Sequence, residues 1–187
     1  MRVIAGALKG RRLATPRGPH TRPTADQVRI AVMDALAPWL PGARVLDLFA
    51  GAGGVGLEAL SRGAAHVTFV ERDARAIAAL RQNVEALGVA GQVRVVRGDV
   101  DREIGRLAAA GERFAVVFLD PPYEAGLTET TLLRLAGAAA IPPGAIVVAQ
   151  HFTKQAPAET IGRLRAFRTR RFGETTLTFY RAEAPAA

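Results

Sequence analysis

Four consecutive residues, Asp120-Pro121-Pro122-Tyr123, could together hold a nucleobase by its exocyclic amine. They follow the apolar run 114–119, which predicts that Asp120 stands at the end of a buried strand. The Asp120 carboxylate and the Pro121 carbonyl can accept the two amine hydrogens. The Tyr123 ring can stack on a base extruded from its neighbours, and Pro122 helps to set the turn. An ordinary Pro-Pro turn is the alternative, but we expect a catalytic role for all four residues.

A glycine-rich loop upstream has the spacing of a nucleotide-binding site. Residues 51–56 read Gly-Ala-Gly-Gly-Val-Gly, and Glu71 lies twenty positions after the first glycine. This spacing matches the dinucleotide fingerprint, in which glycines let the backbone turn tightly and approach a ligand. The loop and the segment before it supply the candidate cofactor contacts Asp47, Phe49, Gly51 and Gly53.

The carboxylates near this loop favour a cationic cofactor. Asp47 would repel a pyrophosphate, whereas S-adenosylmethionine is cationic at its sulfur and at its amino group. Glu71 can accept both ribose hydroxyls, and Asp99, followed by Val100, can accept from the adenine amine. Because open α/β sheets bind ligands at the carboxyl ends of their strands, these acids predict an S-adenosylmethionine site.

Asp120 is expected to end the strand beside that of Asp47, and so to lie over the cofactor methyl group. A free exocyclic amine is a weak nucleophile because its lone pair is delocalised into the ring. Accepting its hydrogens favours a pyramidal nitrogen aimed at the methyl group. Methyl transfer then depends on positioning and electrostatics more than on a strong base.

The chain around these residues alternates between strand and helix patterns. We expect a first helix over 25–36, capped by Thr24, and later helices from Val55, Asp73, Val100 and Leu127. Asp73 and Asp101 are expected to cap helices or occupy turns. The expected strands cover 44–49, 66–71, 92–96, 114–120 and 145–150. This order predicts an α/β fold with a mostly parallel sheet and helices on both faces.

The two ends of the chain depart from this alternation. Residues 2–14 predict a basic β-hairpin or arm, and 164–171 with 175–181 predict an antiparallel hairpin. A chain of 187 residues is expected to form one domain. Within it, we expect an arm and loop over 1–24, a catalytic core over 25–181 and a frayed tail over 182–187.

The charge distribution favours nucleic acid as a partner, although a solvated basic surface is the alternative. The net charge is +8, and basic residues gather at the two ends. The candidate RNA contacts are Arg2, Lys9, Arg11, Arg12, Arg17, Arg168, Arg170 and Arg171.

The sequence does not favour a metalloprotein or a membrane protein. There is no cysteine, and His20, His66 and His151 lack metal-ligand spacing, so we expect no metal. No apolar run is long enough for a membrane span, and we expect a cytoplasmic protein.

These motifs together resemble the bacterial 16S ribosomal RNA guanine-N2 methyltransferases of the RsmD type. The resemblance covers almost the whole chain, through 1–6, 21–24, 46–51, 57–64 and the Asp120 motif. It implies a Rossmann-like class I methyltransferase with a seven-stranded sheet, whose final hairpin supplies strands six and seven. It also implies methylation of one guanine in 16S rRNA of the 30S subunit, with Arg22 and Thr24 over the cofactor and base. We expect the protein to be a monomer.

Two departures and three alternatives accompany the resemblance. Ile30 and Gln150 stand where family members usually carry glutamate.

A DNA adenine-N6 methyltransferase would share the chemistry but usually needs a separate recognition domain. A nicotinamide-dependent oxidoreductase would use the glycine loop and Glu71. A non-catalytic RNA-binding or assembly factor would keep the fold alone.

Overall fold

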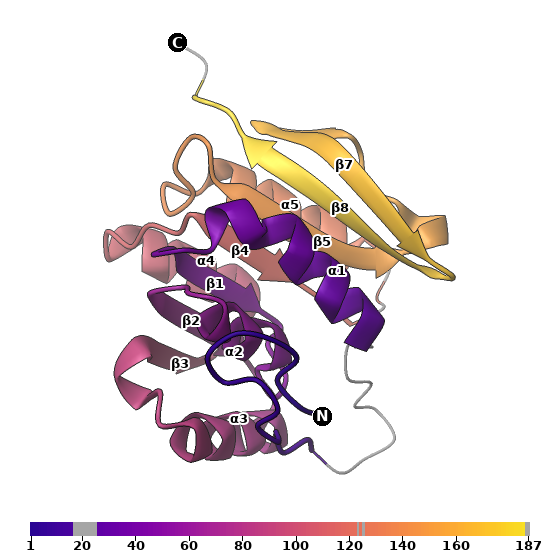
Figure 1. Ribbon diagram of the computed structural model, residues 1–187. Helices are drawn as coiled ribbons and strands as arrows, with labels where there is room; N and C mark the ends of the chain where they lie inside the picture. Colours follow the sequence, from indigo (N-terminus) through magenta and orange to yellow (C-terminus); the bar gives the residue numbers. More distant parts are fainter. Residues whose placement is uncertain (17–25, 123, 125, 186–187) are drawn as a thin grey trace.

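One eight-stranded sheet forms the centre of the computed structural model, which describes residues 1–16, 26–122, 124 and 126–185 (Figure 1). The strand order is β3-β2-β1-β4-β5-β8-β7-β6, in which the first five strands are parallel and β8 runs antiparallel to β5. The strands are β1 (Arg44–Leu48), β2 (His66–Glu71), β3 (Val93–Arg97), β4 (Val116–Leu119), β5 (Ile146–Phe152), β6 (Thr160–Ile161), β7 (Leu164–Phe172) and β8 (Thr175–Ala182).

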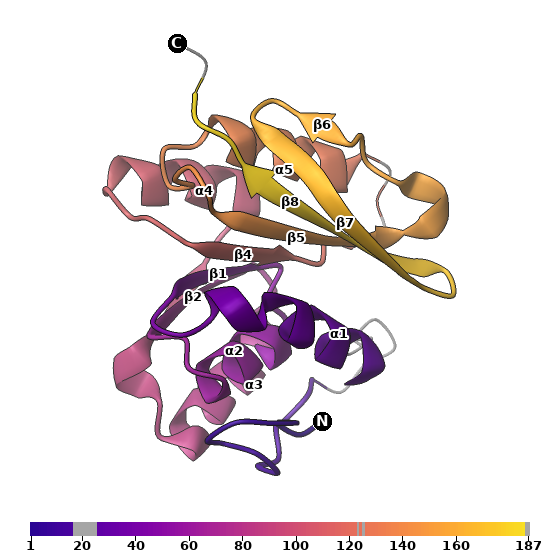
Figure 2. The same ribbon diagram turned by 45° about the horizontal axis from the view of Figure 1, so that its top comes forward.

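Helices cover both faces of the sheet, as Figure 2 shows. One face carries α1, α2 and α3, and the other carries α4 and α5, each over its own apolar core. The helices are α1 (Asp26–Leu36), α2 (Gly54–Ser61), α3 (Ala74–Leu87), α4 (Val100–Ala109) and α5 (Leu127–Gly137), with short 3-10 turns at Ala37–Trp39, Ala90–Gln92 and Thr153–Gln155.

The α/β class, the parallel sheet, the helices on both faces and the C-terminal hairpin are confirmed. The prediction of seven strands is wrong, because β6 adds an eighth. This strand is only two residues long, too short for a period-two pattern to reveal it. The expected frayed tail also begins too early, since Ala182 is buried in β8, where its amide donates to the Ala145 carbonyl at 2.9 Å.

The α3 helix follows directly from its sequence. Its apolar stripe, Ile77, Leu80, Val84 and Leu87, is buried throughout. Asp73 caps the helix as predicted, accepting hydrogen bonds from the amides of Arg75 at 3.0 Å and Ala76 at 2.8 Å. This cap fixes the end of α3 beside the carboxyl edge of the sheet.

The N-terminal arm is a loose hairpin packed against α2, with a single antiparallel bridge between Arg2 and Arg12. Gly6 lies so close to α2 that an added Cβ would stand 1.8 Å from the Ser61 carbonyl oxygen. The Ser61 hydroxyl accepts from the Leu8 amide at 2.9 Å. The arm is therefore part of the folded body rather than a free extension.

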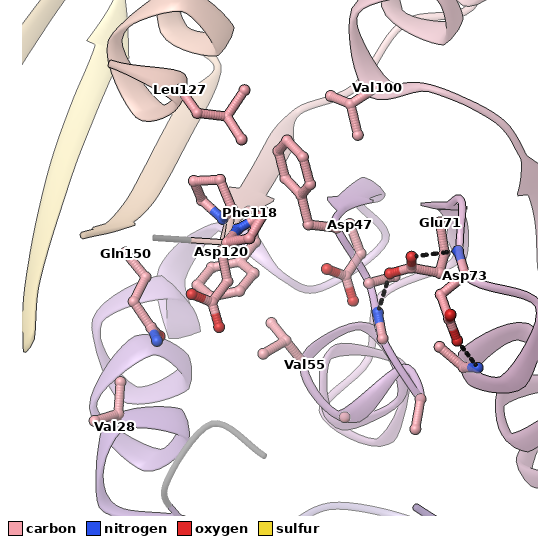
Figure 3. A pocket seen from close by; sticks show the side chains of 18 of the residues that line it. Val28, Asp47, Val55, Glu71, Asp73, Val100, Phe118, Asp120, Leu127 and Gln150 are labelled. Atoms are coloured by element: carbon pink, nitrogen blue, oxygen red, sulfur yellow. Dashed lines mark hydrogen bonds between the residues drawn. The ribbon is translucent and has the colours of Figure 1, made fainter. Parts of the chain in front are cut away.

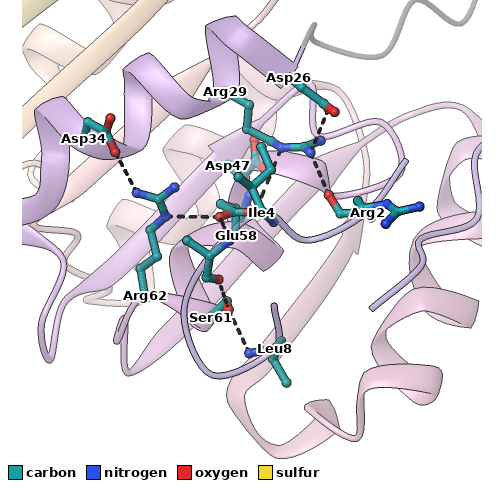
Figure 4. A network of polar contacts seen from close by, with 12 residues as sticks. Arg2, Ile4, Leu8, Asp26, Arg29, Asp34, Asp47, Glu58, Ser61 and Arg62 are labelled. Carbon is teal, nitrogen blue, oxygen red and sulfur yellow. Dashed lines mark hydrogen bonds and ion pairs between the residues drawn. The ribbon is translucent and has the colours of Figure 1, made fainter. Parts of the chain in front are cut away.

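A buried carboxylate holds the beginning of this arm (Figure 4). Glu58 of α2 is 1% exposed and accepts from the amides of Ile4 at 2.8 Å and Ala5 at 2.9 Å. Its side chain also accepts from Nε of Arg62 at 3.0 Å and lies 4.0 Å from Nε of Arg29. Glu58 therefore connects α1, α2 and the arm.

Candidate functional site

The carboxyl ends of the parallel strands open into a cavity of about 1460 Å³. Its lining joins β1, β2, β4 and β5 to α1, the glycine loop and the tip of the β7–β8 hairpin. In the close view, Gln150, Asp120, Asp47 and Glu71 follow one another in the strand order β5-β4-β1-β2 (Figure 3). The cavity therefore brings together most of the predicted cofactor and catalytic residues that the structure describes: Asp47, Phe49, Gly51, Glu71, Asp99, Val100, Asp120, Pro121 and Pro122.

The glycine loop forms one wall of this cavity. Phe49 directly follows β1 and has a left-handed φ of 58°, which is uncommon for a residue with a side chain. Gly51 has a φ of 57°, and a Cβ added there would meet nothing within 4 Å. Gly53, with a φ of 83°, directly precedes α2 but does not line the cavity, because a Cβ added there would stand 2.3 Å from the buried Leu80 side chain. The loop therefore leaves open space for a ligand beside Gly51, whereas Gly53 allows close packing against the core.

Asp47 is a buried carboxylate, 2% exposed, that accepts from the Gly56 amide at 2.9 Å. Burial raises its pKa well above the ordinary value, and the negative charges of Asp120 and Glu71 raise it further, against the effect of the Gly56 hydrogen bond. These three carboxylates repel one another, so a cation bound among them would be stabilised.

Replacing Asp47 with asparagine is expected to raise the melting temperature of the ligand-free protein. Asparagine keeps an oxygen for the Gly56 amide but removes the buried charge. Because the pKa of Asp47 is raised in the folded protein, wild type loses stability relative to the variant as the pH rises from about 4 to that raised pKa. The melting-temperature gap should therefore widen with pH. Thermal melts across this range measure it, and a pH-independent gap would contradict the assignment.

Glu71 is held by backbone amides at the end of β2. One carboxylate oxygen accepts from Gly51 at 2.8 Å, and the other accepts from Arg72 and Asp73, each at 2.8 Å. These bonds fix the carboxylate on the cavity wall. A carboxylate oxygen has more than one lone pair, so this arrangement leaves capacity for ligand hydroxyls.

Asp99 serves as a helix cap as well as a cavity residue. It is the N-cap of α4, and its side chain accepts from the Arg102 amide at 3.3 Å. It lines the cavity beside the buried Val100. The expected cap or turn role of Asp101 is wrong, because Asp101 lies inside α4 and pairs with Arg134 at 3.2 Å.

The Asp120 motif stands where the sequence predicted, directly after β4 and beside β1. Asp120, Pro121 and Pro122 all line the cavity. The Pro122 carbonyl accepts from the Glu124 amide at 2.6 Å. Four predicted residues, Arg17, Arg22, Thr24 and Tyr123, lie outside the described part of the chain.

Arg29 is a cavity residue that sequence reasoning missed. Its side chain is 0% exposed, and it donates to the Arg2 carbonyl at 2.7 Å and to Asp26 at 2.9 Å. Among the described residues, its Nε and Nη1 atoms have no hydrogen-bond partner. Burial lowers its pKa, although Asp26 and Glu58 act against this effect. A signal existed in the sequence, since Arg29 shares an i, i+4, i+7 stripe with Met33 and Leu36.

The predicted RNA-binding residues lie in two groups, on either side of α1 (Figure 1). Arg2, Lys9, Arg11 and Arg12 are exposed on the N-terminal arm. Arg168, Arg170 and Arg171 are exposed on β7, and Arg171 also lines the cavity. The arm reaches the cavity through Met1 and Thr15. Both basic groups therefore belong to segments that border the cavity.

Among the described residues, no helix has the length and hydropathy needed to cross a membrane. Nor does that part of the chain bring three His, Cys, Asp or Glu side chains together as metal ligands.

Comparisons with known proteins agree with this geometry. The family model described as Conserved hypothetical protein 95 matches residues 1–181. YlbH of Bacillus subtilis is 37% identical over 181 residues, which cover 97% of this chain and 98% of that protein. Ribosomal RNA small subunit methyltransferase D of Escherichia coli is 42% identical over 132 residues, 71% of this chain and 65% of that protein.

Solved structures share the fold. The structure of yhhF from Escherichia coli is 33% identical, with a TM-score of 0.87 over 98% of both chains. The class I methyltransferase fold predicted from the sequence is thereby confirmed. The chain belongs to the Conserved hypothetical protein 95 family, which is the RsmD-type family that its sequence resembles.

Proposed function

We propose that this protein transfers a methyl group from S-adenosylmethionine to the N2 amine of one guanine in 16S rRNA. The target would be the guanine at position 966 in the conventional numbering. The observation that carries the proposal is the meeting of Asp120 with Asp47 and Glu71 in one cavity. Family membership and the name of the Escherichia coli relative support the rRNA substrate.

The residues present fit S-adenosylmethionine, which supplies an electrophilic methyl group when bound. Asp47 would lie near its cationic methionine end, and Arg29, with two donor atoms unpartnered among the described residues, would meet its carboxylate. Glu71 would accept the ribose hydroxyls, and Asp99 with Val100 would border the adenine. Phe49, Gly51 and Gly53 would shape the loop around it, and Arg22 and Thr24 are proposed as further contacts.

Asp120 and the Pro121 carbonyl would hold the guanine amine. Pro121 is the better acceptor of the two prolines, because the Pro122 carbonyl already accepts from Glu124. S-Adenosylmethionine would supply the methyl group to N2. The Asp120 carboxylate would stabilise the positive charge that develops on the nitrogen and take up the proton that N2 loses, which then passes to solvent. Tyr123 would stack on the base.

The β7 strand offers a surface for the RNA that flanks the target. Its exposed residues include Phe167, which is 45% exposed, lies 5.4 Å below the Arg181 guanidinium and packs edge-on against Trp39. Arg168 and Arg170 follow on the same strand, which ends at the cavity. Aromatic rings interleaved with arginines suit single-stranded RNA, which binds by stacking and phosphate contact.

Replacing both Arg168 and Arg170 with alanine is expected to weaken RNA binding with little change in cofactor binding. If each contacts one phosphate of a single strand, the slope of log K against log salt falls by about 1.4 in magnitude. Fluorescence anisotropy over a salt series measures this slope. The matched control is Arg106→Ala with Arg113→Ala, two exposed arginines on α4 and the loop before β4. An equal loss of RNA affinity in both double variants would contradict the assignment of β7 as an RNA-binding surface.

Labelled methyl transfer tests the proposed function. Small subunits from a strain without this protein should accept label from S-adenosylmethionine, whereas subunits already methylated should not. Naked 16S rRNA, offered in parallel, distinguishes the free RNA from the assembled particle as substrate. Calorimetry that found NAD binding without S-adenosylmethionine binding would favour an oxidoreductase instead.

A further inference from the structure

Gln150 lies directly beside Asp120 at the carboxyl edge of the sheet. Leu119 of β4 pairs with Ala149 of β5, so the next residues along these parallel strands are Asp120 and Gln150. Figure 3 shows the Gln150 side chain next to Asp120, on the side of Val28 of α1. Both residues line the cavity. A group held by Asp120 would therefore have Gln150 as its neighbour.

The side-chain oxygen of Gln150 is buried without a hydrogen-bond partner among the described residues. The residue is 6% exposed, and within the described part of the chain its Oε1 has no hydrogen-bond partner. Most buried polar side-chain atoms in folded proteins are paired. On the same strand, the buried His151 is fully paired, since its ring nitrogens contact the Phe152 carbonyl and the Thr178 hydroxyl, each at 2.8 Å. Within the described residues, the side chain of His151 is therefore paired, whereas the amide oxygen of Gln150 is not.

We propose that Gln150 reads the Watson–Crick edge of the target guanine, and this inference rests on the proposed function. While Asp120 accepts from the N2 amine, the Gln150 amide oxygen accepts from N1–H and the amide nitrogen donates to O6. Neighbouring strands lie about 4.8 Å apart, a spacing comparable to the width of that edge. Gln150 is therefore a specificity residue that contacts the base, distinct from the residues that hold the methyl donor.

The proposal predicts discrimination against 2-aminopurine. This base keeps the 2-amine but has no hydrogen on N1 and no oxygen at position 6. Wild type should prefer guanine over 2-aminopurine at the target position by about 10-fold to 100-fold in kcat/KM, the range for a bidentate amide–base pair. Gln150→Met keeps the length of the side chain without its polar atoms, so its preference should fall to within about 3-fold of unity.

The test compares kcat/KM on two rRNA fragments that differ only in guanine or 2-aminopurine at the target. It uses wild type, Gln150→Met, Gln150→Glu and, as control, Thr68→Val, a buried hydroxyl on β2 outside the cavity that, like the Gln150 oxygen, has no hydrogen-bond partner among the described residues. Gln150→Glu, which introduces the residue that family members usually carry here, should keep a preference for guanine, because its carboxylate accepts from N1–H and is repelled by the N1 lone pair of 2-aminopurine. The proposal is supported if Gln150→Met loses the preference for guanine over 2-aminopurine, the other proteins keep it, and S-adenosylmethionine affinity is unchanged.

Two different results would overturn the proposed role of Gln150. Active Gln150→Met with wild-type preference would refute the role of Gln150 while leaving the methyltransferase intact. A wild type that transfers no methyl group to either RNA would overturn the proposed function together with this inference. Thermal melts separate a folding defect from a recognition defect. Because methionine replaces an amide with an unpaired buried oxygen, the melting temperature of Gln150→Met should equal or exceed that of wild type.

Discussion

Replacing Asp120 with alanine is expected to lower kcat at least about 100-fold while S-adenosylmethionine still binds. Losses of this size follow when one preorganised group that stabilises transition-state charge is removed. Asp120 stands at the end of β4 on the cavity wall, near enough to Asp47 for their charges to interact. Single-turnover methyl transfer measures the rate, and calorimetry measures cofactor affinity.

The matched control for this prediction is Asp120→Asn, which keeps the shape and one acceptor oxygen. It should retain more activity than alanine but less than wild type. Removing negative charge near Asp47 should also weaken binding of the cationic cofactor only modestly, because Asp47 and Glu71 remain. Wild-type turnover in Asp120→Ala would contradict the assignment of the catalytic site.

Replacing Glu58 with alanine is expected to destabilise the protein by about 3–5 kcal/mol, the typical cost of removing one partner from a buried ion pair. Glu58 is 1% exposed and accepts from the amides of Ile4 and Ala5. Its loss leaves those amides unpaired and leaves the buried Arg29 with Asp26 alone as its acidic partner. Urea denaturation monitored by circular dichroism measures the free energy of unfolding.

Glu85→Ala is the matched control for Glu58, since Glu85 is an exposed glutamate on the neighbouring α3. Its change should stay within about 0.5 kcal/mol. A loss below about 1 kcal/mol in Glu58→Ala would show that the arm is held by other contacts. Exchange of the Ile4 and Ala5 amides with deuterium would then remain slow, whereas we expect it to accelerate.

Much of the fold was predictable because the information is local. The apolar runs that became β1, β2, β4 and β5 are short and bounded by glycines, prolines or acids. Asp73 was predicted as a cap from its position alone, and its hydrogen bonds confirm this. The meeting of Asp47, Glu71 and Asp120 was predictable because parallel strands end at one edge.

The remaining features depend on contacts between distant segments. The stripe on α1 placed Arg29 on the buried face, but its partners could not be predicted, because Arg2 and Glu58 lie far from it in the sequence. The docking of the arm depends on Glu58 and Ser61, more than fifty residues from the amides that they bind. Gln150 was visible only as a departure from the family pattern, because its unpaired amide oxygen is a property of the folded sheet.

The departure at position 30 has a simple outcome. Ile30 lies on the outer side of α1 and is 38% exposed, while its neighbour Arg29 is fully buried. Isoleucine at position 30 therefore does not disturb the contacts that Arg29 makes with Arg2, Asp26 and Glu58.

Mapping the modified nucleotide tests the central claim most directly. Small subunits from a strain lacking this protein would be incubated with it and labelled S-adenosylmethionine, and their 16S rRNA digested and analysed by mass spectrometry. We predict N2-methylguanosine at a single position, absent when Asp120→Ala is used. Label on an adenine, on several guanines, or on no nucleotide at all with active-site residues intact would contradict the account.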